Sequence, residues 1–445
     1  MRLPPGPSSP ALLQTLHWLR RPNQYMAECA ARFGDIFRIQ ISGYGTAAIV
    51  SSPELIKEIF AGSADVFLGG KSNEMVRPFV GSNSVLVLDG PEHQRQRKLL
   101  MPALHGERMH AYGQAMLELT NAAIDSWPLH QNFALHTQMQ VITLRVILRT
   151  IFGVAAGPQF ERLFVLLHEG VELASNPLLL FPIMQRELGG YSPWGRFMHM
   201  SRQVDEILRE EVAQRRKSSD ADARADVLTM LMKARDEHGQ EMSFQELRDE
   251  LVTMLVAGHE TTATALGWTM VGLLQDSALC QKLRDELAGA CENGHLVPEK
   301  IAKLELLDAT VREGLRLHPI APVVGRLLAK PIQLGGFDIP AGWVVAPSVY
   351  LAHHRASVFQ NPERFEPERF LQSRPSPSDW LPFGGGVRRC PGAAFATYEM
   401  KLVLASILWR TQLRLKPGYV AKPTRRGVTL APSEKVPVIM DQRST

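Results

Sequence analysis

The sequence predicts a mainly helical fold with small β-sheets, on the basis of three observations. Helical periodicity runs through most of the chain, strand-like runs are few and short, and no strand–helix–strand pattern repeats. The missing repeat makes a Rossmann sheet or a (β/α)₈ barrel unexpected. Because no long linker or internal repeat divides the chain, we interpret residues 1–445 as a single domain with a sizeable core.

Helices are expected where apolar residues recur at helical spacing between polar ones. Four such segments are 109–127, 139–152, 196–216 and 278–288. The clearest helix begins at Ser243, which forms a capping-box pattern with Glu246, and its apolar residues run past Leu273. At about 1.5 Å per residue, a helix of this length can cross a whole domain.

Strand signals gather towards the two ends of the chain. They fall at 35–41 and 47–50, at 332–334 and 343–346, and at 428–430 and 436–440, with Gly- or Pro-containing turns nearby. The last two are expected to close a hairpin.

Composition and charge exclude several classes of protein. The chain is 45% hydrophobic and 21% charged, with a net charge of +4, so no nucleic-acid partner is indicated. Four scattered cysteines fit neither a disulfide framework nor a zinc site, and they suit a reducing compartment. No signal peptide and no apolar run of about 18 residues is visible. We therefore expect a soluble, cytoplasmic protein without a transmembrane anchor.

The sharpest motif is Phe383-Gly-Gly-Gly-Val-Arg-Arg-Cys-Pro-Gly392. Successive glycines let a backbone press against something flat. Arg388 stands two residues before Cys390 and can reach an anion near the sulfur. Pro391 opens an expected helix to Trp409, whose N-terminal dipole favours a thiolate. Taken by itself, Cys390 could also be a buried structural cysteine.

These residues match the haem-binding signature of the cytochrome P450 family, Phe-x-x-Gly-x-Arg-x-Cys-x-Gly, at every fixed position. The resemblance extends over nearly the whole chain. It implies the P450 fold, with a long central helix over haem b. It also implies an axial thiolate from Cys390, and places Phe383 and Gly392 in the haem-binding loop.

Two further motifs follow the order of that family. Glu313 and Arg316 share one helix face at i,i+3, and Pro367-Glu-Arg-Phe370 lies about twenty residues before Cys390. The resemblance implies that Glu313, Arg316 and Arg369 form a buried charge cluster that braces the cysteine loop. The near duplicate at 362–365 is less well spaced. These residues are structural in either case.

A polar patch, Ala257-Gly-His-Glu-Thr-Thr262, interrupts the long apolar helix. Glycine and threonine are poor helix formers, and threonine side chains can bend a helix. By resemblance, Thr261 would hydrogen-bond dioxygen or an ordered water, and Glu260 would relay protons. The alternative is a surface-facing turn. His259 is interpreted as a side chain near the helix surface rather than a metal ligand.

Haem propionates require cations. By resemblance, His93, Arg97, Arg326 and Arg388 would supply them. The alternative for residues 93–98 is a solvated basic helix face.

The resemblance also implies an electron donor, since the chain has no room or motif for a flavin domain. A separate ferredoxin or flavodoxin with its reductase is expected. Arg95, Lys98, Arg389 and Lys401 would steer this acidic carrier, unless they are ordinary surface charges.

Substrate contacts in this family correspond here to residues 66–88, 171–184, 251–261, 323–327 and 427–431, which are strongly apolar. The candidate contact residues are Phe67, Phe79, Val80, Phe181, Val323, Val324 and Thr429. Their alternative role is core packing. A lipophilic substrate is expected, and motif style favours a fatty acid, an alkane or a terpenoid.

The expected function is therefore a haem-thiolate monooxygenase that uses O2 and two electrons. Two alternatives stay open. One is a peroxygenase or isomerase that does not use O2, and the other is a non-catalytic haem sensor.

Overall fold

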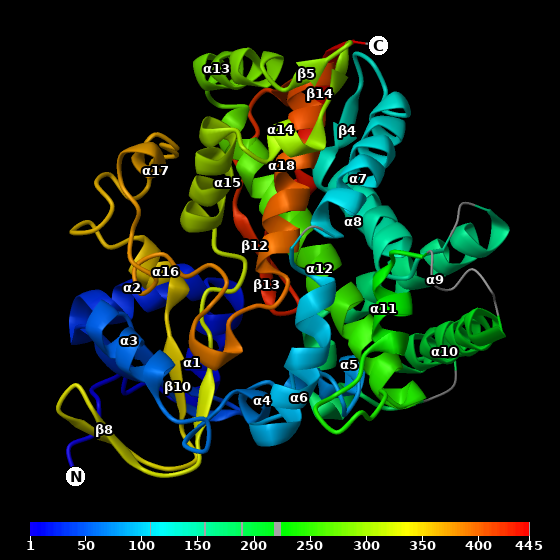
Figure 1. The fold of residues 1–445 in the computed structure, drawn as a ribbon. Coiled ribbons are helices and arrows are strands. Elements are labelled where there is room, and N and C mark those ends of the chain that lie inside the picture. The colour runs from blue at the N-terminus through cyan, green and yellow to red at the C-terminus, as the bar shows by residue number, and fades with distance from the viewer. Residues whose placement is uncertain (107, 155–156, 188–189, 218–223, 445) are drawn as a thin grey trace.

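The computed structural model describes residues 1–106, 108–154, 157–187, 190–217 and 224–444, and helices dominate these residues (Figure 1). The longer helices are α1 (Ala11–Arg20), α2 (Pro22–Phe33), α3 (Pro53–Ala61), α6 (Gly90–Leu100), α7 (Arg108–Asp125), α8 (Leu135–Thr150), α9 (Pro158–Ala174), α10 (Pro193–Lys217), α12 (Phe244–Leu273), α13 (Ser277–Ala288), α15 (Glu305–Leu317) and α18 (Ala393–Arg410). The shorter helices are α4 (Gly69–Ser72), α5 (Arg77–Val80), α11 (Val227–Lys233), α14 (Pro298–Ile301), α16 (Val349–His353) and α17 (Arg369–Gln372). The predicted fold class is confirmed.

Short 3-10 turns link these helices. They are η1 (Glu74–Val76), η2 (Met101–Ala103), η3 (Pro177–Leu180), η4 (Pro182–Met184), η5 (Gly386–Arg388) and η6 (Ser433–Lys435).

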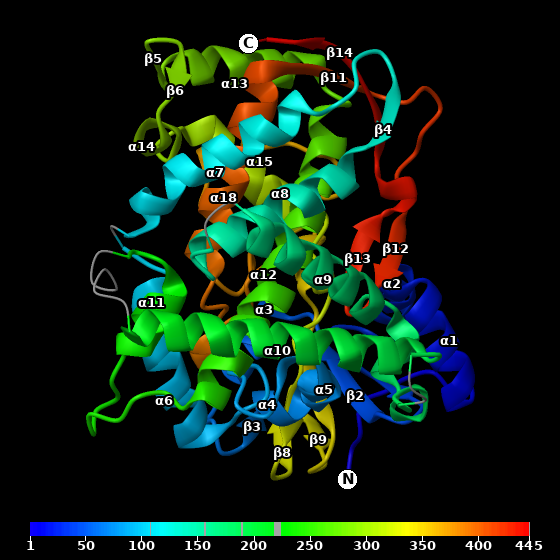
Figure 2. The same cartoon turned by 90° about the vertical axis from the view of Figure 1, so that its right-hand side faces the viewer.

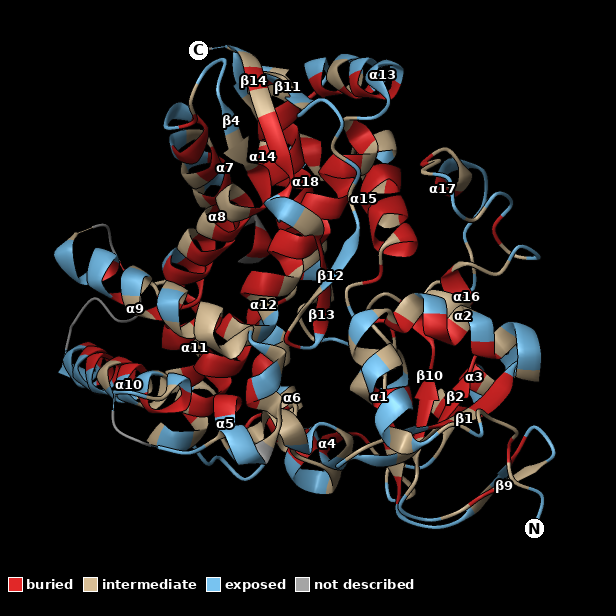
Figure 3. Cartoon of the chain, turned by 180° about the vertical axis from the view of Figure 1, so that it is seen from behind, coloured by how far each residue is buried: buried red, intermediate tan, exposed pale blue. Residues whose placement is uncertain are grey.

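Helix α12 begins where the capping box predicts. The Ser243 N–H donates to Glu246 Oε2 at 2.7 Å, and the Glu246 N–H donates to Ser243 Oγ at 3.2 Å. The helix then packs against α8, α15 and α18 in the largest core cluster. Most of α12 is coloured as buried in Figure 3. Most residues of this 30-residue helix are buried, including the polar side chains of Asp249, Glu250, His259 and Glu260.

The largest sheet joins distant parts of the chain in the order β1-β2-β10-β7-β3. These strands are β1 (Ile36–Ile41), β2 (Gly45–Val50), β3 (Phe67–Leu68), β7 (Arg326–Leu328) and β10 (Val344–Pro347). The β1–β2 hairpin is antiparallel, and β10 runs parallel to β2 with Val345 opposite Ala48. The strands predicted at 35–41, 47–50 and 343–346 therefore lie in one sheet, whereas the segment predicted at 332–334 does not belong to it.

The prediction of a last hairpin between 428–430 and 436–440 is wrong in its pairing. Strand β13 (Thr429–Pro432) pairs with β12 (Pro423–Arg426), whereas β14 (Pro437–Arg443) lies between β11 (Thr411–Leu415) and β4 (Asn132–Ala134). Non-glycine residues in the left-handed region at 434–436 turn the chain between β13 and β14 into different sheets. The remaining pairs are β5 (Cys291–Glu292) with β6 (His295–Leu296), and β8 (Ile332–Leu334) with β9 (Phe337–Ile339).

The β12–β13 hairpin, called the terminal hairpin below, lies against the central helix. Trp268 Nε1 of α12 donates to the Leu430 carbonyl at 2.8 Å. Figure 2 shows the hairpin beside α12, with α9 and α10 lying side by side across the same face. Strands and helices far apart in sequence thus surround the middle of α12.

In the part of the chain that the structure describes, no helix combines the length and the apolarity that a membrane span requires.

Candidate active site

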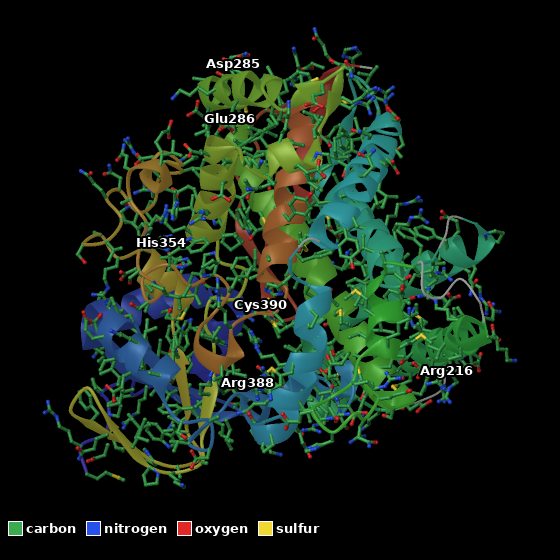
Figure 4. The ribbon with its side chains drawn as sticks, in the orientation of Figure 1. Arg216, Asp285, Glu286, His354, Arg388 and Cys390 are labelled. Atoms are coloured by element: carbon green, nitrogen blue, oxygen red, sulfur yellow. The ribbon has the colours of Figure 1, made fainter. Side chains whose placement is uncertain are left out.

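The loop that carries Cys390 lies near the centre of the ribbon, just before α18 (Figure 4). The Cys390 N–H donates to the Phe383 carbonyl at 2.9 Å and closes the loop. Gly384 and Gly386 adopt φ angles of +65° and +64°, which L side chains rarely tolerate. The loop therefore requires glycine at both positions for its own turn.

The glycine run was expected to lie against a flat group. Part of it lies against the aromatic side chain of Phe60. A Cβ atom on Gly385 would lie 2.3 Å from the Phe60 ring, and one on Gly386 would lie 2.3 Å from the Phe60 carbonyl oxygen. Phe60 belongs to α3, so the cysteine loop rests on that helix. Sequence reasoning missed Phe60, since no motif surrounds it.

The Cys390 side chain is exposed, although its label lies near the centre of the molecule in Figure 4. Burial nevertheless raises its pKa, while the Gly392 N–H and the nearby Arg97 and Arg389 act in the opposite direction. A thiol that faces a space inside the protein, rather than bulk water, is both exposed and surrounded by protein atoms that raise its pKa. Helix α18 begins at Ala393, with Gly392 as its N-cap residue, so the predicted start at Pro391 is slightly early.

The structure brings His93, Arg97, Arg326 and Arg388 into one electrostatic cluster. Arg388 pairs with Asp89 and donates to the Val85 carbonyl. Burial lowers the pKa of Arg326 to about 10. It also lowers the pKa of His93 to about 4, and Arg388 and Arg97 add to this effect.

These residues fit the two propionates of a haem. Within the described ranges, Arg388 pairs with Asp89, whereas neither Arg97 nor Arg326 forms an ion pair with a carboxylate. Unpaired charge is costly inside a protein, and two further carboxylates would balance this cluster. Asp89 was missed, because its carboxylate binds the Gly70 and Lys71 N–H groups instead of capping α6.

The middle of α12 presents an accessible strip in an otherwise buried helix. Ala257 is exposed and Thr261 is half-buried, while most residues of α12 are buried. Thr261 Oγ1 donates to the Ala257 carbonyl within the same helix. Because Ala257 and Thr261 are four residues apart, they lie on one face of the helix.

Glu260 and His259 do not face that strip. Glu260 is buried, and its oxygens accept hydrogen bonds from Gln140 Nε2 and Arg426 Nε, each at 2.8 Å. His259 was expected near the helix surface, and this is wrong: it is buried against α8, with Nδ1 at 2.9 Å from Thr143 Oγ1. The close packing of α8 on α12 explains the difference.

Glu313, Arg316 and Arg369 form a buried ionic cluster, as the resemblance implies. Arg316 binds both Glu313 oxygens at 2.7 and 2.9 Å, and Arg369 Nε donates to Glu313 Oε1 at 3.1 Å. Arg316 also donates to the carbonyls of His353, Pro362 and Arg364.

His353 connects this cluster to the cysteine loop. Its Nδ1 lies 3.1 Å from the Arg316 carbonyl, and its Nε2 accepts the Leu381 N–H at 2.9 Å. Leu381 stands two residues before Phe383. The cluster can therefore hold the loop in place through one histidine that the sequence did not single out.

Comparison with known proteins agrees with this geometry. The family model described as cytochrome P450 matches residues 4–438. The chain belongs to the cytochrome P450 family. Cytochrome P450 135B1 of Mycobacterium tuberculosis is 35% identical over 432 residues, covering 97% of this chain and 90% of the relative. Cytochrome P450 138 of Mycobacterium bovis is 35% identical over 444 residues, covering 100% of this chain and 97% of the relative.

A solved structure supports the P450 fold. Retinoic acid-bound cyanobacterial CYP120A1 superposes with a TM-score of 0.85, at 24% identity, covering 99% of this chain and 100% of the other. Members of the family are oxidoreductases that bind haem b through an axial cysteine thiolate and act as monooxygenases. The enzyme class and the cofactor expected from the sequence are thus confirmed.

The seven predicted substrate residues of this P450 lie in different surroundings. Phe79 and Val80 are buried in a cluster with Leu179, Trp194 and the α12 residue Val256. The others are placed as follows: Phe67 packs against Gly62, Phe181 lies beside Tyr44, Val323 bridges Ser348, Val324 lies near Gly384, and Thr429 bonds the Arg426 carbonyl. The structure places Phe79 and Val80 of α5 and Thr429 of β13 on elements that pack against α12, and the assignments stay predictions.

The basic surface expected for an electron donor is smaller than predicted. Lys401 is buried and donates to the Ala302 carbonyl and to Asp308, so its place in that surface is wrong. Arg95 is paired with Asp236 and Glu246. Lys401 lies on a face of α18 that packs into the core, which helical spacing alone does not reveal.

Replacing Arg97 by leucine is expected to weaken haem retention roughly ten- to a hundredfold, because hydrogen bonds to charged groups contribute about 1.5–3 kcal/mol. The rate of haem transfer to apomyoglobin measures this loss. Lys98→Leu, on the same helix but in an exposed pair with Glu237, is the matched control and should retain haem normally. Equal retention in both variants would remove Arg97 from the propionate site.

Proposed function

We propose that this P450 hydroxylates a lipophilic small molecule, of the fatty-acid, alkane or terpenoid class, with O2 and two electrons. The observation that carries the proposal is the apolar cluster beside the accessible strip of α12. It comprises Phe79, Val80, Val87, Leu179 and Trp194, with Val256 packed against it. Aromatic contacts stiffen it, since Phe79 meets Trp194 edge-on at 5.5 Å between ring centroids.

A wall of this kind recognises shape and apolar area, because none of the cluster's members carries a charge. The position of the substrate on the strip would then decide which carbon reacts. When bound, haem supplies the activation of O2, promoted by charge from the cysteine thiolate. The chain's own residues hold the substrate, exclude water and supply protons.

The substrate class can be tested by optical titration of the purified ferric enzyme. Fatty acids, terpenes and steroids are added separately, and the Soret band reports displacement of water from the iron. We expect saturable shifts with long apolar ligands and none with short polar analogues of the same functional groups. Shifts with polar ligands alone would contradict the proposal.

Thr261 is proposed to hold a water or dioxygen by its hydroxyl. Thr261→Ala is expected to uncouple electron use from hydroxylation, so that a larger share of the NAD(P)H consumed appears as hydrogen peroxide. Product and peroxide are measured per NAD(P)H oxidised. Thr262→Ala is a matched control, since Thr262 is buried on the adjoining face of α12. Unchanged coupling in Thr261→Ala would remove the proposed role.

The electron donor is proposed to be a separate ferredoxin or flavodoxin with its reductase. Exposed Arg389, next to Cys390, supports approach from that side. Turnover with NAD(P)H, a ferredoxin and its reductase tests this. Turnover with peroxide alone would favour the peroxygenase alternative, and failure of every lipophilic ligand to shift the Soret band would favour a non-catalytic haem protein. We also propose that residues 1–445 act as one catalytic domain. Because the four cysteines are free thiols, we propose that the enzyme works in the cytoplasm.

A further inference from the structure

The buried carboxyl of Glu260 belongs to a polar network that spans four elements. Gln140 of α8 donates to Glu260 Oε2 at 2.8 Å, and Arg426 of β12 donates to Glu260 Oε1 at 2.8 Å. Arg426 Nη2 also donates to Glu172 Oε1 of α9 at 2.7 Å, and Gln140 reaches the same oxygen at 3.3 Å. We call Gln140, Glu172, Glu260 and Arg426 the Glu260 network.

The network runs from the interior towards solvent. The side chain of Glu260 is 8% exposed, that of Arg426 is 17% exposed and that of Glu172 is 36% exposed. Two carboxyl groups therefore compete for one guanidinium group, and the outer one can exchange charge and protons with water. Because the inner carboxyl is the more expensive one to ionise, the guanidinium largely determines its charge.

The two outer residues of the network, Glu172 and Arg426, lie on elements other than α12. Glu172 lies near the C-terminal end of α9, and Arg426 is the last residue of β12. The Gly427 N–H donates to the Ser175 carbonyl at 2.6 Å, and Thr429 Oγ1 donates to the Arg426 carbonyl at 2.9 Å. The end of α9 and the tip of the terminal hairpin therefore meet directly beside Arg426.

Glu172 lies within residues 171–184, and Arg426 immediately precedes residues 427–431, two segments that the family resemblance assigns to substrate contact. The hydroxyl of Thr261 bonds within its own helix, and neither Glu260 oxygen bonds to it. In the conformation described, Glu260 is turned towards α8 and the hairpin.

We propose that Arg426 is a positioning residue: it holds the Glu260 carboxyl away from Thr261 and, through Glu172 and the terminal hairpin, makes release of that carboxyl depend on the substrate-contact segments. A substrate that displaces the end of α9 or the hairpin tip loosens Arg426 and frees Glu260. This inference rests on the proposed monooxygenase function and adds a point of regulation to it.

The electrostatics of the network agree with this arrangement. Burial raises the pKa of Glu260, and Arg426 and Gln140 oppose that rise while Glu172 adds to it. Burial pushes the pKa of Glu172 upwards, but Arg426, Lys435 and Gln140 together oppose it, and the net shift is downwards.

The other ionisable groups around the network come from every element packed on it. Lys435 of η6 acts on Glu172, and His136, His168 and His259 lie on α8, α9 and α12. Burial lowers the pKa of His136 and His259 to about 3, so both are neutral near neutral pH. Arg426 and Glu172 are therefore the groups whose removal should move the titration of Glu260, and in opposite directions.

The test is an infrared pH titration of the ferric holoenzyme, in which a protonated buried carboxyl shows a carbonyl stretch that disappears on ionisation. Glu260→Gln assigns the band. Arg426→Gln should shift its midpoint to higher pH, because the opposing positive charge is lost. Glu172→Gln should shift it to lower pH, because Arg426 then serves Glu260 alone. Arg426→Lys should restore most of the original titration.

Arg425→Gln is the matched control. Arg425 adjoins Arg426 in β12 and is also shielded from solvent, but it donates to the Trp18 and Leu19 carbonyls instead of the network. This variant should leave the midpoint of Glu260 unchanged even if it lowers thermal stability. Equal midpoints in the wild type, Arg426→Gln and Glu172→Gln would overturn the inference, as would the same shift in Arg425→Gln.

Two features keep the test decisive. If Arg426→Gln does not fold, Glu172→Gln and Arg426→Lys still give shifts of known sign. The infrared titration needs no turnover. If the expected shifts appear but the enzyme hydroxylates nothing, the proposed function is contradicted and the electrostatic role of Arg426 is retained.

Adding a ligand that shifts the Soret band should also move the Glu260 midpoint in the wild type. A midpoint that ignores such a ligand would overturn the coupling to substrate.

Discussion

Cys390→Ser is expected to abolish the red-shifted Soret band of the reduced carbon-monoxide complex and to eliminate monooxygenase turnover. A serine oxygen does not donate charge to iron as a thiolate does, so the spectral signature of thiolate ligation is lost. The loop itself should survive, because its closing hydrogen bond uses the Cys390 backbone N–H. Absorption spectra of the reduced protein with and without carbon monoxide measure the effect.

Cys291→Ser is the control for this experiment. Cys291 is a free, half-buried thiol in the short strand β5, remote in sequence from the cysteine loop. It should keep both the red-shifted band and turnover. A red-shifted band in Cys390→Ser would show that the axial ligand is another residue.

Arg316→Met is expected to lower the free energy of unfolding by about 3–5 kcal/mol, since removing one partner of a buried ion pair leaves an uncompensated charge. Glu313 would keep only Arg369, and the carbonyls of His353, Pro362 and Arg364 would each lose a donor. Urea unfolding of the holoenzyme, with its midpoint and slope, gives the change. Because His353 connects this cluster to Leu381, haem should also dissociate faster.

Lys282→Met provides the comparison with an exposed pair. Lys282 binds Glu368 at 3.0 Å on the surface, where such pairs contribute about 0–1 kcal/mol.

The double variant Glu313→Gln/Arg316→Met should recover part of the lost free energy of unfolding, because the unbalanced buried charge is removed. It should not recover all of it, because the three carbonyls stay unsatisfied. A loss below about 1 kcal/mol in Arg316→Met would show that solvent reaches the cluster.

Local features of the sequence predicted local structure well. Ser243 and Glu246 marked the start of α12 because a capping box is satisfied within four residues. The glycine run was expected to let the backbone press against something flat, and Gly385 and Gly386 do lie tightly against Phe60. The cysteine, the propionate cations and the Glu313 cluster could be named because family motifs fix their spacing.

Contacts between distant segments could not be predicted in this way. Gln140 and Arg426 lie 120 and 166 residues from Glu260, and nothing near either one indicates a shared partner. The pairing of β13 with β12 instead of β14 depends on three residues with positive φ, which none of the usual turn residues signals. Lys401 was misplaced because burial of a helix face depends on the neighbours that cover it. Which distant residues or strands become partners depends on how the whole chain packs.

The hydrogen bond between Arg388 and Asp89 has a consequence for the timing of synthesis. The two residues are 299 positions apart in the chain. At about 5–20 residues per second, a ribosome needs roughly 15 to 60 s to make the segment between them. During that interval the Asp89 segment exists without its arginine and without the cysteine loop. Capture of the cofactor by both halves of the site must therefore wait until late in translation, when the Arg388 segment has been made.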